Sequence, residues 1–239
     1  MNKLVVVVLA AGKGTRMKSD LSKVCHKVGS KTMIEHVVDA ASMVCPRDIV
    51  VVVSKDNIGD IKKSLTNRRV RFKLQLEQLG TGHAVLSAVP CCNDSNDLLV
   101  LLGDVPLIHP KTLNKIVSTN YDAVVVGFNE TKDNKFGRII IENDKVTKIV
   151  EYLDATEEER LVKLCNSGML WIKAEYVPLL YNIDNNNKKK EYYLTDIVKI
   201  MVKEGLDIGF IKANIDECMG VNTQEDLKLV NDIYELNKI

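Results

Sequence analysis

The chain has 239 residues, of which 46% are hydrophobic and 27% are charged, and its formal net charge is +1. This length and composition fit a folded protein with a sizeable core and exclude an intrinsically disordered chain. A general nucleic-acid-binding protein normally carries a basic excess, so the near-zero charge predicts no nucleic-acid partner and confines any anion site to one local region.

The first predicted element is an apolar stretch at residues 4–11, which begins with Leu4 and includes the valines at 5–8. It is too short to cross a bilayer, so we predict no membrane partner. A signal peptide is the alternative, but the β-branched run and the basic residues Lys13, Arg16 and Lys18 after it favour a buried strand that leads into a basic loop. The six cysteines contain no CxxC pair, which favours reduced thiols. We therefore expect a cytoplasmic protein.

Apolar and amphipathic segments alternate along the first half of the chain. Strands are expected at residues 4–9, 48–53, 72–75, 98–102 and 123–128, and helices at 32–44, 57–65, 82–89 and 110–118. Nearly continuous apolar strands separated by helices predict an α/β fold, with a mostly parallel sheet flanked by helices on both faces. Ligands of such sheets bind beyond the carboxyl ends of the strands, where the loop after residue 9, Gln75, Gln78 and Asp104 would meet.

The pattern changes after Gly127. The stretch GRIIIENDKVTKIVEY predicts two short strands joined at Asn143 and Asp144. Further strands are expected at 169–172 and 208–211, and helices at 194–203 and 223–236. We interpret these as small α+β insertions around the same sheet, and we expect one domain over residues 1–239. The biased stretch NNNKKK at 185–190 is expected to be a solvated loop.

The loop after the first strand, within LAAGKGTRMKSDLSK at residues 9–23, is a candidate anion site. Gly12 and Gly14 let backbone N–H groups approach an anion closely, and Lys13, Arg16 and Lys23 add positive charge. A triphosphate is the natural ligand of such a loop. The stretch has neither the Walker spacing nor a GxGxxG fingerprint. Taken alone, a glycine turn is also typical of an ordinary strand-to-helix connection.

The same stretch resembles the nucleotide signature of the sugar-phosphate nucleotidylyltransferases, which is LAAGxGTRM followed by a Pro-Lys pair. Within that family, it is similar to the uridylyltransferase half of the bacterial bifunctional N-acetylglucosamine-1-phosphate uridylyltransferases. The resemblance continues in order through SDLSKVCHKV, EQLGTGHA, GDVPLI, FGRI, IVEYLDAT, CNSGM, EYYLTDI and GVN, and so covers nearly the whole chain. It implies a Rossmann-like nucleotide-diphospho-sugar transferase fold. The hexapeptide-repeat acetyltransferase domain of the bifunctional relatives is not visible in this sequence, so we expect no acetyl-coenzyme A binding.

The function that the resemblance implies is Mg²⁺-dependent transfer of a uridylyl group from UTP to N-acetylglucosamine 1-phosphate. The products would be pyrophosphate and UDP-N-acetylglucosamine, a precursor of the cell envelope. Two alternatives stay open: a nucleotidylyltransferase that uses UTP, dTTP or CTP with another sugar or polyol phosphate, and a catalytically silent nucleotide-binding regulatory homologue. The presence of Arg16, Lys23, Asp104 and Asn222 together argues against the silent homologue. The oligomeric state does not follow from the sequence.

By resemblance, Arg16 and Lys23 are the catalytic cations, and Asp104 and Asn222 hold Mg²⁺. A carboxylate at the end of an apolar strand suits this ion, which prefers oxygen ligands. The alternatives are a plain turn at Asp104 and a helix cap at Asn222, directly before the helix expected from Thr223.

The resemblance also implies a nucleotide site, in which amide side chains match the donors and acceptors of the uracil edge. Its residues would be Leu9, Ala10, Ala11, Gly12, Lys13, Gly14, Thr15, Gln75, Gln78, Gly80 and Thr81. His83, within the same block, is expected to be structural.

The implied sugar site consists of Gly137, Glu151, Asn166, Tyr193 and Thr195. The sequence departs from the family pattern at three places. Ser22 stands where proline is usual, which predicts a less rigid loop with its charge retained. Phe136 replaces a tyrosine, and the lysines at 188–190 replace Ala-Gln-Gly. The last two changes would alter closure over the sugar.

Overall fold

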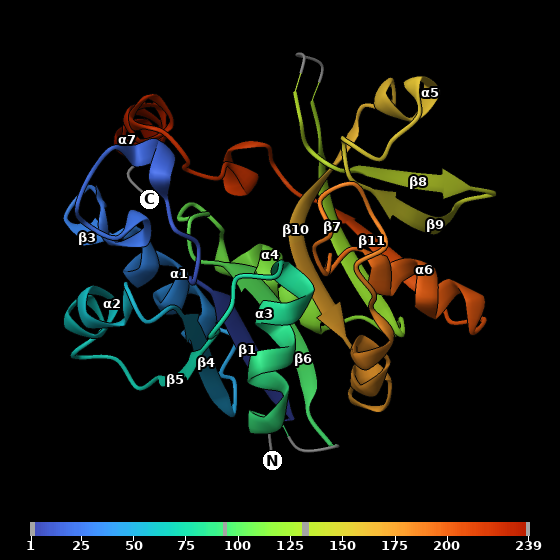
Figure 1. Ribbon diagram of the computed structural model, residues 1–239, viewed down its shortest axis with the longest axis horizontal. Helices are drawn as coiled ribbons and strands as arrows, with labels where there is room; N and C mark the ends of the chain where they lie inside the picture. The colour runs from blue at the N-terminus through green and yellow to red at the C-terminus, as the bar shows by residue number, and fades with distance from the viewer. Residues whose placement is uncertain (1–2, 93–94, 131–133, 238–239) are drawn as a thin grey trace.

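The strand β1 lies near the middle of a mixed sheet in the computed structural model of this chain, which describes residues 3–92, 95–130 and 134–237 (Figure 1). The strands are β1 (Leu4–Leu9), β2 (Lys27–Val28), β3 (Lys31–Thr32), β4 (Asp48–Val53), β5 (Arg71–Leu74), β6 (Asp97–Leu102), β7 (Ala123–Asn129), β8 (Arg138–Glu142), β9 (Lys145–Val150), β10 (Leu164–Ile172) and β11 (Ile208–Lys212).

Helices connect these strands. The α-helices are α1 (Met33–Ser42), α2 (Ile58–Ser64), α3 (Thr81–Ala88), α4 (Pro110–Val117), α5 (Glu157–Arg160), α6 (Asp196–Lys203) and α7 (Gln224–Asn237). Short 3-10 helices are η1 (Thr15–Met17), η2 (Lys23–Cys25), η3 (Val89–Cys91), η4 (Ala174–Asn182) and η5 (Asp216–Cys218).

The main sheet has the strand order β11-β7-β10-β6-β1-β4-β5. β1 pairs in parallel with β4 and β6, β4 with β5, and β7 with β11, whereas β10 runs antiparallel between β6 and β7. The β8–β9 hairpin attaches to β10 outside this row, and β2 and β3 form a separate small sheet. The predicted α/β fold with a mostly parallel sheet is therefore confirmed.

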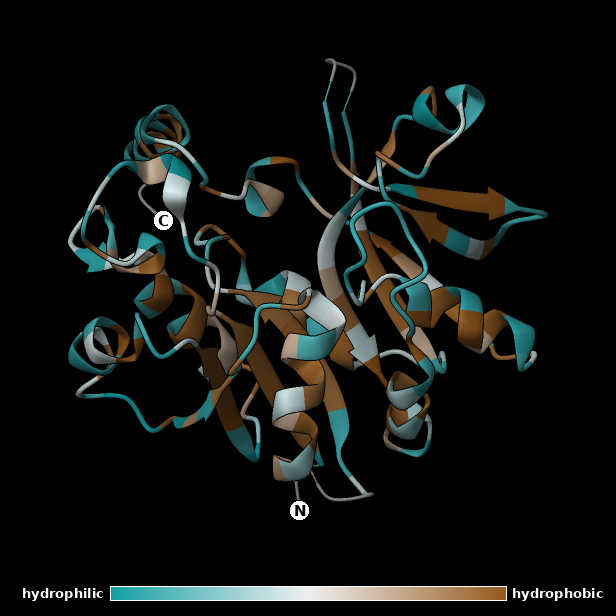
Figure 2. Cartoon of the chain, viewed as in Figure 1, coloured by the Kyte–Doolittle hydropathy of each residue, from teal (hydrophilic) through white to brown (hydrophobic). Residues whose placement is uncertain are grey.

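The sheet separates two hydrophobic clusters. Val6 and Val8 belong to one cluster, while Val5 and Val7 belong to the other, because successive side chains of a strand point to opposite faces. Helices α1 and α4 cover the first face with Ile34, Val37, Leu113 and Ile116. Helices α3, η4 and α6 cover the second face with Val85, Leu180, Ile197 and Met201. Figure 2 shows β1, β4 and β6 predominantly hydrophobic, as buried parallel strands must be.

A third cluster joins the C-terminal helix to the N-terminal loop. Helix α7 lies beside the segment that carries β2 and β3 (Figure 1). Gly29 has a φ of 58°, and a Cβ there would lie 2.4 Å from the ring of Tyr234. Asn231 accepts a hydrogen bond of 3.0 Å from the Gly29 N–H. The cluster itself consists of Met17, Val28, Met33, Leu107, Val221 and Val230. Residues near positions 17 and 221 are thereby brought together.

One strand differs from its prediction. The strand expected at 169–172 begins at Leu164, and its pairing with β7 shifts register between Asn166 and Leu170. Gly168 within this irregularity has a φ of 83°, and a Cβ there would lie 2.7 Å from Leu102 Cδ1. The first half of the strand was not predicted, because the polar residues of the bulge interrupt the hydrophobic pattern. The 3-10 helix η4, with a proline inside it, was also not predicted.

The hairpin and the polar loop agree with their predictions. Asn143 and Asp144 have φ values of 50° and 62° between β8 and β9, as a tight hairpin turn requires. In the NNNKKK stretch Asn187 is half-buried and the other residues are exposed.

Within the described residues, no helix is long and apolar enough to pass through a membrane. Cys25, Cys165 and Cys218 are buried, and Cys91 and Cys92 are half-buried. Burial raises the pKa of the thiols of Cys25, Cys165 and Cys218, so these groups stay protonated and unreactive at neutral pH.

An ion-pair network ties α1 to the segment after α2. The Arg68 guanidinium donates to both carboxylate oxygens of Asp39 at 2.7 and 3.0 Å and to Glu35 Oε1 at 2.8 Å. Burial opposes the ionisation of both carboxylates, but hydrogen bonds from Thr32 and Arg68 hold the pKa of Glu35 below its usual range. Hydrogen bonds from Arg68 and Lys31 do the same for the pKa of Asp39.

We expect Arg68→Met to lower the free energy of unfolding by about 1–2 kcal/mol at pH 7, a value discounted for partial exposure. Lowered carboxyl pKa values stabilise the fold above the unfolded pKa, roughly pH 4, and this stabilisation is lost as pH falls through the folded values. Urea unfolding of the wild type and the variant should therefore converge near pH 2–3. Lys31→Met, which removes the more exposed partner of Asp39, is the control and should cost less. A difference that is constant from pH 7 to pH 2.5 would contradict this account.

Candidate active site

A cavity of about 340 Å³ opens at the carboxyl ends of β1, β5 and β6. Of the residues expected to bind the nucleotide, all except Gly14 and Thr15 line it. The N-terminus of α3, at Gly80 and Thr81, also faces this cavity and contributes partial positive charge. The lining comprises Leu9, Ala10, Ala11, Gly12, Lys13, Lys23, Val24, Gln75, Gln78, Gly80, Thr81, Ala84, Leu102, Asp104 and Glu191.

The two glycines of the basic loop have different roles. Gly14 has a φ of 63°, and a Cβ there would lie 2.6 Å from Lys23 Cβ. The missing side chain is therefore what lets the loop close against Lys23. A Cβ at Gly12 would meet nothing within 4 Å, so this position leaves space in the cavity and imposes no special backbone conformation. Met17, which is buried in the third cluster, anchors the loop.

Four charged and polar side chains converge beside the cavity. The Lys23 ammonium contacts Asp104 Oδ2 and donates to Asn222 Oδ1 at 3.1 Å. Arg16 Nη2 donates to the same Asn222 oxygen at 3.0 Å. The side chains of Lys23 and Asp104 are 13% and 20% exposed, so their attraction is less screened than that of a surface pair. The expected catalytic and metal residues thus lie in one group.

Asn222 does not cap α7 with its side chain. Asp226 Oδ2 accepts hydrogen bonds of 2.9 Å from the N–H groups of Asn222 and Thr223. Thr223 Oγ1 accepts from the Asp226 N–H at 3.1 Å. Thr223 and Asp226 therefore cap the helix reciprocally, and the Asn222 side chain is left to contact Arg16 and Lys23.

The donor set of Asp104 and Asn222 suits a hard cation. Both side-chain oxygens contact the single ammonium group of Lys23, so they converge on one centre of positive charge. Carboxylate and amide oxygens are ligands that Mg²⁺ accepts. The described part of the chain contains no group of three or more His, Cys, Asp or Glu residues able to hold a metal. A divalent ion at this pair would therefore complete its coordination with water and substrate oxygens.

The expected base-binding amides are fixed by the loops around them. Gln75 is buried and donates to the Gly80 carbonyl at 3.1 Å. Gln78 donates to the Ala11 carbonyl at 2.9 Å, which connects the loop after β5 to the loop after β1. His83 Nδ1 lies 3.2 Å from Gln75 Nε2, and its ring lies beside Tyr192. These contacts confirm the structural role predicted for His83.

A second cavity of about 90 Å³ adjoins the first and shares Thr81 and Leu102 with it. Glu151, Asn166 and Thr195 line this second cavity. Thr195 Oγ1 donates to Glu151 Oε1 at 3.0 Å. Burial raises the pKa of Glu151, and the hydrogen bond from Thr195 only partly opposes this. The second cavity therefore contains a carboxylate of unusually high proton affinity.

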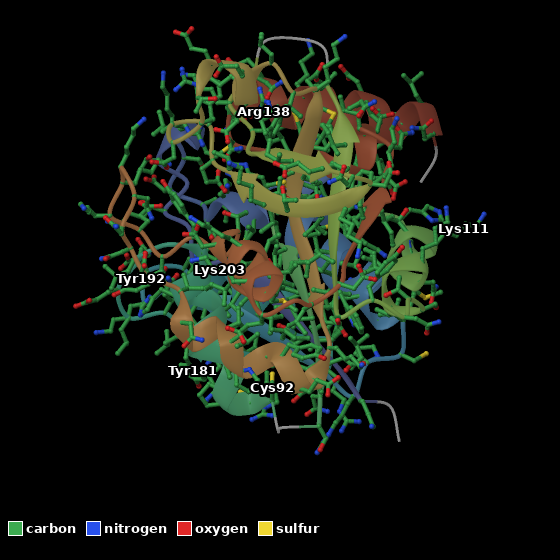
Figure 3. The ribbon with its side chains drawn as sticks, turned by 90° about the vertical axis from the view of Figure 1, so that its right-hand side faces the viewer. Cys92, Lys111, Arg138, Tyr181, Tyr192 and Lys203 are labelled. Atoms are coloured by element: carbon green, nitrogen blue, oxygen red, sulfur yellow. The ribbon has the colours of Figure 1, made fainter. Side chains whose placement is uncertain are left out.

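Gly137 lies beside the second cavity. A Cβ there would lie 3.4 Å from Glu151 Oε2, and its carbonyl accepts from the Asn166 N–H at 2.8 Å. The next residue, Arg138, is buried and donates to Asn134 Oδ1 at 2.9 Å and to the Arg160 carbonyl at 3.3 Å. Figure 3 shows Arg138 at the end of the molecule that carries the β8–β9 hairpin. This buried guanidinium fixes the start of β8 and hence Gly137.

Tyr193 does not line the second cavity. It lines a third cavity, of about 590 Å³, which it shares with Glu151, Asp154, Asp184 and Asp196. Tyr193 is 8% exposed, and burial raises the pKa of its hydroxyl to about 12. Of the expected sugar residues, Glu151, Asn166 and Thr195 thus line the second cavity, Gly137 contacts two of them, and Tyr193 meets Glu151 only at the third cavity.

The sequence did not predict some residues that line the first cavity, nor the contacts made at two of the departures from the family pattern. Glu191 and Leu102 line the first cavity but were not singled out, although they lie within or beside recognised blocks.

Ser22 has a φ of −51°, close to the value that proline imposes, and its N–H donates to Asp60 at 3.4 Å. The expected loss of rigidity is therefore offset by a contact that proline cannot make. Phe136 packs edge-to-face on Phe128 with ring centroids 5.1 Å apart.

Comparisons with known proteins agree with this geometry. A family model described as the MobA-like NTP transferase domain matches residues 6–182. The bifunctional protein GlmU of Ruegeria pomeroyi is 37% identical over 235 residues, which are 96% of this chain and 52% of that protein. The chain therefore spans about half the length of this curated relative.

Two solved structures share the fold. A UDP-glucose pyrophosphorylase complexed with UDP-glucose has a TM-score of 0.77 at 19% identity, over 99% of this chain and 100% of that one. A Bacillus anthracis protein assigned as a glucose-1-phosphate thymidylyltransferase, solved with sucrose, has a TM-score of 0.75 at 19% identity, over 96% of this chain and 94% of that one. The chain belongs to the MobA-like NTP transferase domain family, and it is similar to GlmU.

Proposed function

We propose that this chain transfers the uridylyl group of UTP to N-acetylglucosamine 1-phosphate, with Mg²⁺ as cofactor, to give UDP-N-acetylglucosamine and pyrophosphate. The observation that carries the proposal is the convergence of Lys23, Asp104 and Asn222 beside a cavity that adjoins a second, carboxylate-containing cavity. The similarity to GlmU over 96% of this chain supports it.

The reaction needs no nucleophilic side chain. An oxygen of the sugar phosphate attacks the α-phosphorus of UTP, a new P–O bond forms, and the bond to the bridging oxygen breaks to release pyrophosphate. Both reactants are anions, so the protein's task is to align them and to neutralise charge. Lys23 and Arg16 would supply the positive charge, and the backbone of residues 12–15 would bind the triphosphate. Lys23 would have to turn from Asp104 toward the phosphates.

Asp104 and Asn222 would hold the magnesium ion. When bound, Mg²⁺ supplies Lewis-acid neutralisation of phosphate charge and a template for the two substrates. The residues of this chain would do the remaining work. Gln75 and Gln78 would address uracil, Glu151 would accept a hydrogen bond from a sugar hydroxyl, and Asn166 would address the acetamido group.

Substrate identity is tested by a pyrophosphate-release assay that crosses UTP, CTP, dTTP and ATP with several sugar 1-phosphates, with and without Mg²⁺. UTP with N-acetylglucosamine 1-phosphate should give the highest kcat/KM, and chelation of Mg²⁺ should abolish turnover. A preference for CTP, dTTP or another sugar phosphate would replace the proposed substrates. Nucleotide binding without any turnover would indicate a silent homologue instead.

Asp104→Asn should lower kcat by about 100-fold or more at saturating substrates, as expected for loss of a group that supports transition-state electrostatics. The variant should retain its fold, because Asp104 lies at the edge of a cavity and Asn preserves its shape. Circular dichroism and the UTP Kd check this. Asp232→Asn on the exposed face of α7 is the matched control. Near-normal Mg²⁺-dependent turnover in Asp104→Asn would remove Asp104 from the metal site.

Glu151→Gln should raise the KM for the sugar phosphate by about tenfold, which corresponds to one hydrogen bond to a charged group. Because burial raises the pKa of Glu151, the wild-type carboxylate is ionised above that pKa and becomes protonated as pH falls. The wild-type KM should therefore rise toward acid pH, whereas the KM of Glu151→Gln should stay flat. Glu157→Gln on the exposed helix α5 is the control. A pH profile identical in wild type and Glu151→Gln would exclude this role.

A further inference from the structure

Residues 187–195, which we call the strap, run between the two cavities that the proposed function uses. The strap begins with a reciprocal pair of hydrogen bonds. Asn187 Nδ2 donates to the Glu191 carbonyl at 2.5 Å, and the Glu191 N–H donates to Asn187 Oδ1 at 3.2 Å. One half-buried amide side chain therefore closes residues 187–191 into a compact turn.

The second half of the strap is bound to the loop that leads into α3. The Tyr192 N–H donates to the Leu79 carbonyl at 2.8 Å, and the Gly82 N–H donates to the Tyr192 carbonyl at 2.7 Å. The Leu194 N–H donates to Thr81 Oγ1 at 3.0 Å. A Cβ at Gly80 would lie 2.6 Å from the Tyr192 carbonyl oxygen, so glycine is what permits this approach. Figure 3 shows Tyr192 among these loops, away from β8 and β9. The strap is thus attached to the wall of the first cavity.

The first half of the strap is bound to the turn that carries Glu151. The Lys188 N–H donates to Asp154 Oδ1 at 3.1 Å, and the Lys188 ammonium contacts the Leu153 carbonyl. The N–H groups of Asp154 and Ala155 in turn donate to the Glu151 carbonyl at 2.9 and 3.0 Å. At the far end of the strap Thr195 donates directly to the Glu151 carboxylate. Glu151 is therefore supported from both ends of the strap.

The charge of the strap also acts on this carboxylate. Burial is the largest influence on Glu151 and raises its pKa, while the positive charge of Lys189 opposes that effect. Asn187 and Lys188 belong to the NNNKKK stretch, in which the lysines at 188–190 stand where the family pattern has Ala-Gln-Gly. The contact of the Lys188 ammonium with the Leu153 carbonyl is one that an alanine side chain cannot make.

We propose that Asn187 and Lys188 are positioning residues for the sugar phosphate: they hold the strap closed so that Glu151 keeps one orientation in the second cavity. The inference rests on the proposed function, because it assigns the second cavity to the sugar. Ordering a flexible segment costs conformational entropy, and a strap that is already closed in the free protein does not incur that cost on binding. The first cavity also has hydrogen bonds of its own, through Gln75 and Gln78, so we expect these two side chains to affect nucleotide affinity less than sugar-phosphate affinity.

Asn187→Ala should raise the KM for the sugar phosphate about five- to tenfold, because the strap must then be ordered during binding. Lys188→Ala keeps the N–H bond to Asp154 and loses only the ammonium contact with Leu153, so its KM should rise less, about two- to threefold. The kcat and the UTP Kd, measured by calorimetry without sugar phosphate, should stay within twofold of wild type. Asn187→Asp keeps the acceptor for the Glu191 N–H but loses the donor to the Glu191 carbonyl, so it should give an intermediate KM. Lys190→Ala, an exposed residue of the same loop, is the control and should match the wild type.

Amide hydrogen exchange supplies a readout that does not require turnover. In Asn187→Ala and Lys188→Ala, exchange should increase at residues 151–155 and 187–195 and stay unchanged in α1. An unchanged KM, an equal rise in the UTP Kd, or unchanged exchange at 151–155 would overturn the inference. Absence of turnover by the wild type with every sugar phosphate would instead overturn the proposed function, and the exchange data would still decide whether the strap holds the Glu151 turn.

Discussion

The contact of one ammonium group with two oxygen ligands is the interaction on which the site depends. Lys23 contacts Asp104 and Asn222, which lie 81 and 199 residues further along the chain. Each lies on a different element: the loop after β1, the end of β6 and the turn before α7. Because Lys23 and Asp104 are largely shielded from water, their charges attract each other more strongly than a surface pair would, and this stabilises the convergence. Gly14 lacks the Cβ atom that would clash with Lys23. The same arrangement keeps the positively charged groups of Arg16 and Lys23 close to the side-chain oxygens of Asp104 and Asn222.

Packing explains why the convergence is stable. Met17 holds the basic loop in a cluster with Val221 and Val230, so that the loop and the start of α7 are parts of one hydrophobic unit. The Val221 N–H donates to the Asp104 carbonyl at 2.9 Å, which joins the third segment to the other two through the backbone. The charged side chains are therefore carried by fixed backbone, and this limits the reorganisation that binding requires.

The two cavities share lining residues and are linked by hydrogen bonds. Thr81 and Leu102 form part of both walls, and Thr81 also accepts a hydrogen bond from the strap. The Glu151 carboxylate receives the hydroxyl of Thr195 from that strap. Leu194 and Thr195, which are neighbours in the strap, thus link Thr81 to Glu151 through two hydrogen bonds.

The sequence by itself determined the alternation of strands and helices, the mostly parallel sheet, the tight turn at Asn143 and Asp144, and the family. These features depend on local periodicity, on turn chemistry and on motifs that are contiguous in the chain. Tertiary structure alone decided that Asn222 points to Lys23 and not into a helix cap, because Thr223 and Asp226 satisfy that helix end. It also placed Tyr193 in the third cavity and outside the second, began β10 at Leu164 with an irregularity around Gly168, and gave Asn187 and Lys188 partners. Each of these outcomes depends on which of several contacts between distant segments is the more stable, and a local sequence pattern does not contain that information.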